Sequence, residues 1–148
     1  MSKLFLLLLL LQSAPVGEYE ADTNRTFYSL TGTSESGYAR RVRFILSHPG
    51  KERAPIDGII VRLEIRQRAQ PAATFTSSLV IHCKSVTSRP AEVSNNAFDA
   101  ETLAISAQLK PDEARALLAC DAPRLTLAGI EVTPSTYLLA QLRAVLTF

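Results

Sequence analysis

The residues of this 148-residue sequence that could carry chemistry are two cysteines, two histidines and a group of arginines. His82 directly precedes Cys83, and a histidine beside a thiol can activate it as a nucleophile. Adjacent residues of a strand point to opposite faces, however, and the pattern around Cys83 is that of a strand. His48 precedes Pro49-Gly50, a turn signal at which a surface imidazole is the ordinary expectation. We therefore expect no cysteine–histidine nucleophile.

Other catalytic patterns are missing from the sequence. A metal site needs several ligands at close spacing, and neither Cys-x-x-Cys nor His-x-x-x-His occurs. No serine lies in a Gly-x-Ser-x-Gly or Ser-x-x-Lys pattern, and the six glycines form no phosphate-binding loop. The acidic pairs Asp99/Glu101 and Asp112/Glu113 are explained by a loop and a helix start. We expect no enzyme, no metal and no cofactor, with a small exported hydrolase using carboxylates or a serine as the alternative.

The most distinctive feature is a concentration of arginine. The range 38–70 holds eight basic residues against three acids, a net charge of +5, whereas the range 90–148 has a net charge of −3. If the two strands expected in the basic range form a hairpin, five arginines can share one face: Arg41, Arg43, Arg62, Arg66 and Arg68. The planar guanidinium group suits carboxylate, phosphate or sulfate groups. We expect this face to bind an acidic protein or an anionic envelope component.

The alternative for this arginine face is a solvated surface, whose arginine stems cover apolar atoms and discourage edge pairing. Our main hypothesis is a non-catalytic binding protein, such as an inhibitor, an immunity-type protein or an envelope accessory factor. A structural subunit of an envelope assembly is a further alternative. Nucleic acid is disfavoured because no base-stacking aromatic residues are interleaved with the arginines. The oligomeric state is not predicted.

The N-terminus indicates export. Lys3 precedes eight unbroken apolar residues, Leu4–Leu11, and small and polar residues follow, which is the order of a signal peptide. Eight helical residues rise about 12 Å, far less than the roughly 30 Å of a bilayer core, so we expect no membrane span. We predict a signal peptide over residues 1–17, with Ala14 and Gly17 as possible cleavage points. A single periplasmic or extracellular domain over 18–148 should follow.

The predicted export to a periplasmic or extracellular compartment determines how the two cysteines are interpreted. In an oxidising space a pair of cysteines in a small domain is typically bridged, so we predict a disulfide between Cys83 and Cys120, with two buried thiols or one reactive thiol as the alternative. Closing this loop would stabilise the fold by about 4 kcal/mol in the chain-entropy model. Asn24-Arg25-Thr26 also matches the N-glycosylation pattern, which matters only for a eukaryotic or viral source.

Hydrophobic periodicity predicts the elements that position these residues. Strands are expected at 26–33, 38–47, 59–68, 102–109 and 125–132, the last being irregular at Ala128-Gly129. The range 74–87 is expected to be a strand or a bent pair of strands, and the range 88–101 a loop. Lys110-Pro111 should open a short helix, and Thr133-Pro134 a C-terminal helix with threonine as its cap. The predicted class is α+β: a mainly antiparallel sheet of about six strands with both helices packed on it. A β-sandwich with an appended helix is the alternative.

Overall fold

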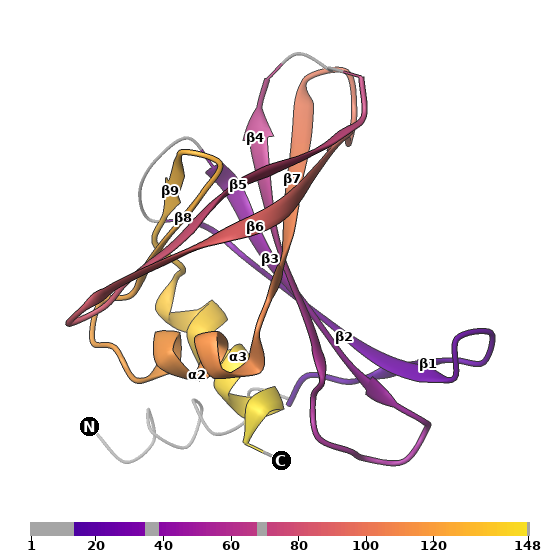
Figure 1. Cartoon of the computed structure of the whole chain (residues 1–148). Helices are drawn as coiled ribbons and strands as arrows, with labels where there is room; N and C mark the ends of the chain where they lie inside the picture. Colours follow the sequence, from indigo (N-terminus) through magenta and orange to yellow (C-terminus); the bar gives the residue numbers. More distant parts are fainter. Residues whose placement is uncertain (1–13, 35–38, 68–70, 148) are drawn as a thin grey trace, which may run out of the picture.

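The computed structural model describes residues 14–34, 39–67 and 71–147. Within these residues nine strands form one antiparallel sheet in the order β1-β2-β3-β4-β7-β6-β5-β8-β9 (Figure 1). The strands are β1 (Glu18–Glu20), β2 (Arg25–Gly32), β3 (Ala39–Pro49), β4 (Gly58–Arg66), β5 (Ala73–His82), β6 (Val86–Ala97), β7 (Thr102–Leu109), β8 (Arg124–Leu127) and β9 (Ile130–Val132). The α+β class is confirmed, but the expected six strands are too few. One continuous sheet is present instead of a sandwich.

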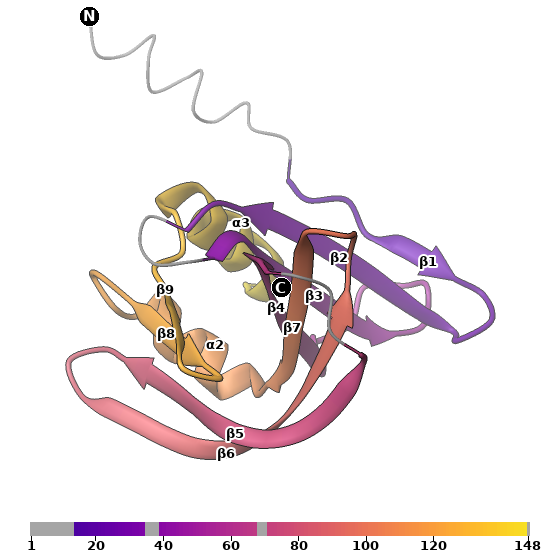
Figure 2. The ribbon, with the colours of Figure 1, turned by 90° about the horizontal axis from the view of Figure 1, so that it is seen from above.

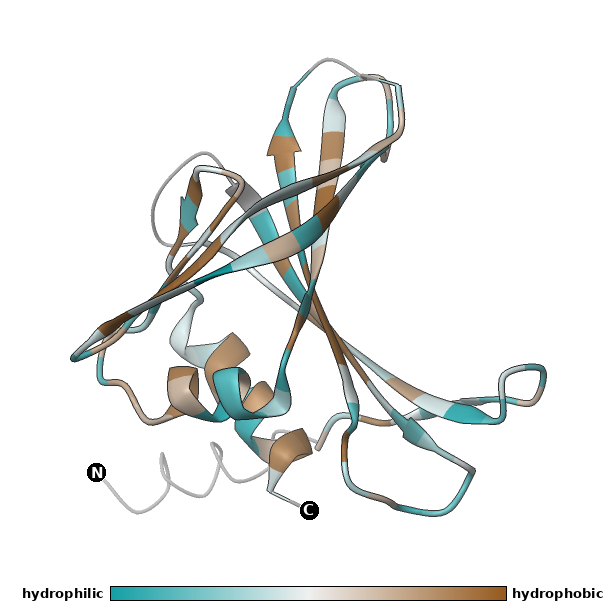
Figure 3. Cartoon of the chain, viewed as in Figure 1, coloured by the Kyte–Doolittle hydropathy of each residue, from teal (hydrophilic) through white to brown (hydrophobic). Residues whose placement is uncertain are grey.

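Alternation along the strands gives the sheet an inner apolar face and an outer, more polar face, visible as changing colours along the ribbons of Figure 3. The sheet curls, and the helices α2 (Pro111–Leu118) and α3 (Thr136–Leu146) lie inside the curl (Figure 2). Phe44, Leu63, Leu117 and Leu142 are among the fully buried members of the single core that joins the sheet to both helices. Burial of each such side chain contributes roughly 1.5–3 kcal/mol. The outer face is thereby left to interact with solvent or a partner.

The C-terminal helix begins two residues later than predicted. Ser135, not Thr133, is the N-cap of α3, and its Oγ accepts a hydrogen bond from the amide of Leu138 at 3.2 Å. Pro134 instead forms an isolated bridge with Ser34. Gly32 of β2 lets the helix approach closely, because a Cβ at this position would lie 2.8 Å from Cβ of Leu138. Helix α3 therefore packs directly against the backbone of β2.

Two segments differ from the sequence prediction. The expected loop 88–101 is largely β6, which pairs with β5 along most of its length. Pro90 does not interrupt this pairing, because β7 pairs with β6 only from Val93 onward and needs no hydrogen bond from the proline. The expected last strand is the hairpin β8–β9. Ala128 and Gly129, with φ of 51° and 77°, form its turn, since a two-residue type I′ turn needs two positive φ angles.

The predicted disulfide is confirmed. Cys83 follows β5, Cys120 follows α2, and their Cα atoms are 5.6 Å apart. The bridge spans 37 positions of sequence and ties the β5–β6 turn to the end of the short helix. Within the described ranges, no helix combines the length and the apolar character that crossing a membrane requires.

Candidate functional site

The predicted arginine face lies on the outer side of the β3–β4 hairpin. In the strand register, Arg43 is directly opposite Arg62, and Arg41 is directly opposite Glu64. All four side chains have the outer parity, because Val42, Phe44 and Leu63 between them are buried in the core. We call Arg41, Arg43, Arg62 and Glu64 the arginine cluster. The strands therefore bring three of the five predicted arginines to one place.

The other two predicted arginines are not part of this cluster. Arg66 has the same parity at the end of β4, and its Nη2 lies 3.7 Å from Oε2 of Glu101, with both side chains mostly exposed. An exposed pair of this kind contributes little, typically less than about 1 kcal/mol. Arg68 lies outside the described residues.

Glu64 is at the centre of the cluster and its side chain is only 4 % exposed. Its Oε2 lies 3.9 Å from Nη1 of Arg41, and its Oε1 lies 3.6 Å from Nη2 of Arg43. Both distances are too long for hydrogen bonds. Oε1 of Glu64 and Nε of Arg43 are buried, and neither has a hydrogen-bond partner among the described residues. Glu64 therefore balances part of the positive charge without engaging the arginine donors.

Arg43 and Arg62 form a like-charge pair across the two strands. Like charges directly opposite in a sheet repel each other. Nε of Arg62 donates to Oγ of Ser106 on β7 at 3.1 Å, which orients its guanidinium. Arg43 is 24 % exposed and Arg41 is 57 % exposed, so both remain accessible. An anion placed over Arg43 and Arg62 would relieve their repulsion.

Next to the arginine cluster the outer face is hollowed by a groove of about 620 Å³. Its lining includes the apolar side chains of Phe27, Ile45 and Ile60, which we call the floor of the outer groove. Ile45 and Ile60 lie opposite each other, two residues along their strands from Arg43 and Arg62. Ile60 is 39 % exposed. The volume is within the range of pockets that bind small ligands or partner side chains.

At the end of the groove away from the cluster, the positive charge is already paired. Nη2 of Arg25 donates to Oγ of Ser47 at 3.0 Å and to Oδ1 of Asp57. The lining also includes Glu92 of β6. The carboxylate of Asp57 at this end, and that of Glu92 on the β6 side of the groove, make the groove itself unfavourable for an anion. Arg43 and Arg62 do not line the groove but form the next row on the same face, so the arginine cluster borders the groove on one side.

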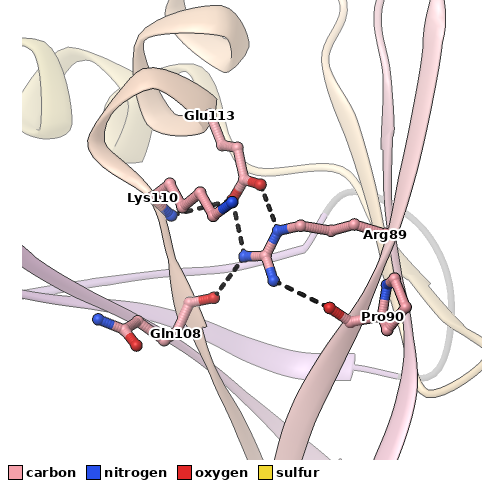
Figure 4. Close-up of polar contacts among 5 residues, drawn as sticks. All are labelled: Arg89, Pro90, Gln108, Lys110 and Glu113. Atoms are coloured by element: carbon pink, nitrogen blue, oxygen red, sulfur yellow. Dashed lines mark hydrogen bonds and ion pairs between the residues drawn. The ribbon is translucent and has the colours of Figure 1, made fainter.

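A second arginine–glutamate arrangement lies on the inner side, between β6 and α2 (Figure 4). Nε and Nη2 of Arg89 donate to the two carboxylate oxygens of Glu113, the latter at 2.9 Å. Arg89 also donates to the carbonyl oxygens of Gln108 at 2.9 Å and Pro90 at 3.2 Å. Glu113 accepts a further bond from the Lys110 amide at 2.9 Å. Sequence reasoning missed Arg89, because it placed this residue in a loop.

This inner pair has shifted ionisation. Burial opposes the charged form of Glu113, but hydrogen bonds from Arg89 and from the Lys110 amide outweigh it and lower the pKa of this carboxyl. The hydrogen bond to Glu113 raises the pKa of Arg89. Both groups are therefore charged across the physiological range, as expected of a structural ion pair.

The histidines and cysteines do not form a nucleophilic site. Cys83 is in the disulfide, and Nε2 of His82 lies 3.3 Å from Oγ1 of Thr126. The prediction of a surface imidazole at His48 is wrong, because this residue is 1 % exposed. Strand β3 continues to Pro49, so His48 keeps the parity of Phe44 and points into the core.

Among residues 14–34, 39–67 and 71–147, no three or more His, Cys, Asp or Glu side chains are grouped so that they could hold a metal ion. Comparisons of the chain with protein-family models, with curated proteins and with solved structures found no match.

Proposed function

We propose that this chain is an exported, non-catalytic binding protein that holds an acidic partner protein on its arginine cluster. The observation that carries the proposal is the geometry around Glu64. Arg41 and Arg43 lie 3.6–3.9 Å from this buried carboxylate without hydrogen-bonding to it. The exposed parts of their guanidinium groups can donate to a ligand, although Nε of Arg43 is buried, and the charge that holds the two side chains in place is already present.

Carboxylates are the natural ligands for such a cluster. An arginine can donate two parallel hydrogen bonds to one carboxylate, and such charge-assisted bonds are about twice as strong as neutral ones. Arg43 and Arg62 are directly opposite in the register, where Cβ atoms are about 4.5–5.5 Å apart. Ser106 and Glu64 restrain these long side chains before binding, which lowers the entropy that a partner must overcome.

Export is the second part of the proposal. It is supported by the basic and apolar order of Lys3 and Leu4–Leu11, which lie outside the described residues. It is also supported by the Cys83–Cys120 disulfide, since such bonds persist in oxidising compartments. Intact-mass measurement of the protein from a periplasmic or culture fraction should show a shortened N-terminus and no thiol that can be alkylated. A full-length mass would contradict export by this signal.

The binding proposal can be tested with poly-L-glutamate as a probe of acidic protein surfaces and dextran sulfate as a probe of anionic glycans. The variant Arg41→Glu with Arg62→Glu should weaken poly-L-glutamate binding at least about tenfold, which corresponds to about 1.4 kcal/mol. The control Lys51→Glu with Lys84→Glu changes the net charge equally, in the β3–β4 connection and the β5–β6 turn. It should weaken binding by less than about threefold, since its charges lie outside the cluster.

Two results would contradict the proposal. Equal losses in the two charge-reversal variants would show that binding depends on net charge and not on the cluster. Cluster-dependent binding of dextran sulfate without binding of poly-L-glutamate would replace the acidic protein by an anionic envelope component. Fluorescence anisotropy of labelled probes, at two salt concentrations, measures both quantities.

A further inference from the structure

We infer that the partner presents an extended segment in which a bulky apolar residue and an acidic residue are two positions apart. The apolar side chain lies in the outer groove, and the carboxylate lies over Arg43 and Arg62. This inference rests on the proposed function and names the chemistry of the acidic partner. It is drawn from three features of the outer face: the spacing of its side chains, the exposed apolar floor and the polarity of the groove walls.

The spacing comes from the strand register. Ile45 lies directly opposite Ile60 across the hairpin and forms one row with it. The next row on the same face consists of Arg43 and Arg62. Successive outer residues of a strand are about 6.6–6.8 Å apart. An extended peptide lying along β3 and β4 has the same repeat. An apolar residue and an acidic residue at positions i and i+2 would therefore reach the two rows together.

The floor of the groove calls for an apolar side chain. Ile45 and Ile60 occupy outer positions, where their neighbours of the same parity within Arg41–Ser47 and Ile60–Arg66 are arginine, glutamate and serine. Ile60 remains 39 % exposed although it lines the groove. Covering this surface removes apolar area from water, which favours binding. A purely acidic ligand would leave this surface uncovered.

The walls of the groove favour a polypeptide over a lipid chain. Ser47, Ser94 and Gln108 line the groove and offer hydrogen-bond donors and acceptors beside the apolar floor. A peptide backbone can pair with such groups, whereas an acyl chain would bury them without partners. The carboxylates of Asp57 and Glu92 also line the groove and disfavour a second acid there. The partner's acidic residue should therefore lie on only one side of its apolar residue.

Synthetic peptides test this inference. The parent is a serine- and glycine-rich octapeptide, blocked at both ends, with one leucine and one glutamate two positions later. Three controls replace leucine by serine, replace glutamate by glutamine, or place leucine and glutamate next to each other. We expect the wild-type protein to bind the parent at least about fivefold more tightly than each control, measured by chemical-shift titration.

The protein variants locate the effect. The Ile60→Ser variant should bind the parent peptide only as tightly as the wild-type protein binds the leucine-to-serine control. It should retain its affinity for poly-L-glutamate, which also shows that the variant is folded. Val86→Ser is the matched control, since Val86 is an exposed apolar residue of the β5–β6 hairpin outside the groove lining. It should leave the affinity for the parent unchanged.

Several outcomes would overturn the inference. Equal affinities for the parent peptide and for the control with adjacent leucine and glutamate would refute the spacing. An Ile60→Ser variant that binds the parent peptide as tightly as the wild type would refute the use of the groove. Binding of phosphatidylglycerol vesicles that depends on Ile60, without binding of the peptides, would make the occupant a lipid. If poly-L-glutamate binds through the cluster but the peptides are not discriminated, only this inference fails. If poly-L-glutamate also does not bind through the cluster, the proposed function fails with it.

Discussion

The two arginine–glutamate arrangements of this molecule use the same residue types in opposite ways. On the inner side, Arg89 grips both carboxylate oxygens of Glu113 and also donates to the Gln108 carbonyl. On the outer side, Arg43 and Arg41 lie 3.6 Å and 3.9 Å from Glu64 without hydrogen bonds to it. The first arrangement joins a strand to a helix, whereas the second leaves its donors facing outward.

The difference shows that the residue types alone do not decide the role of an ion pair. Arg89 lies on the inner face, where α2 brings Glu113 toward it and the Lys110 amide fixes the carboxylate. Glu64 lies beside arginines of its own sheet, directly opposite Arg41 and one row from Arg43. Both carboxylate oxygens of Glu113 accept hydrogen bonds from Arg89, whereas Glu64 accepts none from Arg41 or Arg43. The inner pair should therefore affect stability, and the outer cluster should affect binding.

The strongest test of this division removes the disulfide at the far end of α2. Replacing Cys83 and Cys120 by alanine should lower the free energy of unfolding by about 4 kcal/mol, because the loop of 37 positions is no longer closed in the unfolded chain. Urea denaturation measures this loss. Under conditions where the variant remains folded, its affinity for poly-L-glutamate should be unchanged. A loss of unfolding free energy below about 1 kcal/mol would show that the disulfide does not stabilise the inner side of the sheet around α2.

Breaking the inner pair directly should have the next largest effect. Arg89→Met keeps the aliphatic stem but leaves Glu113 without its main partner, so we expect a loss of about 2 kcal/mol in the free energy of unfolding. Arg115→Met is the control, since it removes the exposed pair of Arg115 with Asp112, worth no more than about 0.5 kcal/mol. Similar losses in the two variants, measured by urea denaturation, would remove the distinction between inner and surface pairs.

The pH dependence of stability should follow the inner pair. The pKa of Glu113 is lower in the folded state than its unfolded value of about 4.3. Its contribution is therefore fully present above about pH 4.3 and is lost as the pH falls through the folded-state pKa. The difference in unfolding free energy between wild type and Glu113→Gln should shrink below about pH 4. A difference that stays constant from pH 7 to about pH 3 would contradict this assignment.

Only a small stability effect is expected at the centre of the outer cluster. Glu64→Gln should change the free energy of unfolding by no more than about 1 kcal/mol, because Oε1 has no hydrogen-bond partner among the described residues and the desolvation cost of the carboxylate is relieved. The same change removes the one negative charge among three arginines. It should therefore increase the affinity for poly-L-glutamate several-fold. A decrease in affinity would show that Glu64 positions the arginines more than it competes with the ligand.

The arginine hairpin was predictable from sequence, because apolar and charged residues alternate over Arg41–Phe44 and Val61–Glu64, which fixes which of these side chains share a face. The β5–β6 hairpin was not, since its serines, threonines and Pro90 resemble a loop until a partner strand supplies the pairing. Arg89 was missed with it. The groove had a signal that was not used: Ile45 and Ile60 are apolar residues at outer positions. Their enclosure by β6 and β7 depends on the curl of the sheet, which local patterns do not encode.

The edges of the sheet bear on how any partner can be recognised. The two edge strands, β1 and β9, have only three residues each, and a bridge between Ser34 and Pro134 joins the end of β2 to the start of α3. The strands β1 and β9 are therefore poor templates for β-augmentation, in which a ligand adds a strand through main-chain hydrogen bonds. Longer edges remain on β2 over residues 28–32 and on β5 over residues 73–78, where β1 and β8 do not pair with them. Main-chain pairing accepts many sequences, whereas contacts on a sheet face depend on each side chain. Specificity in this protein should thus be open to change by single substitutions on the outer face, without altering the scaffold beneath it.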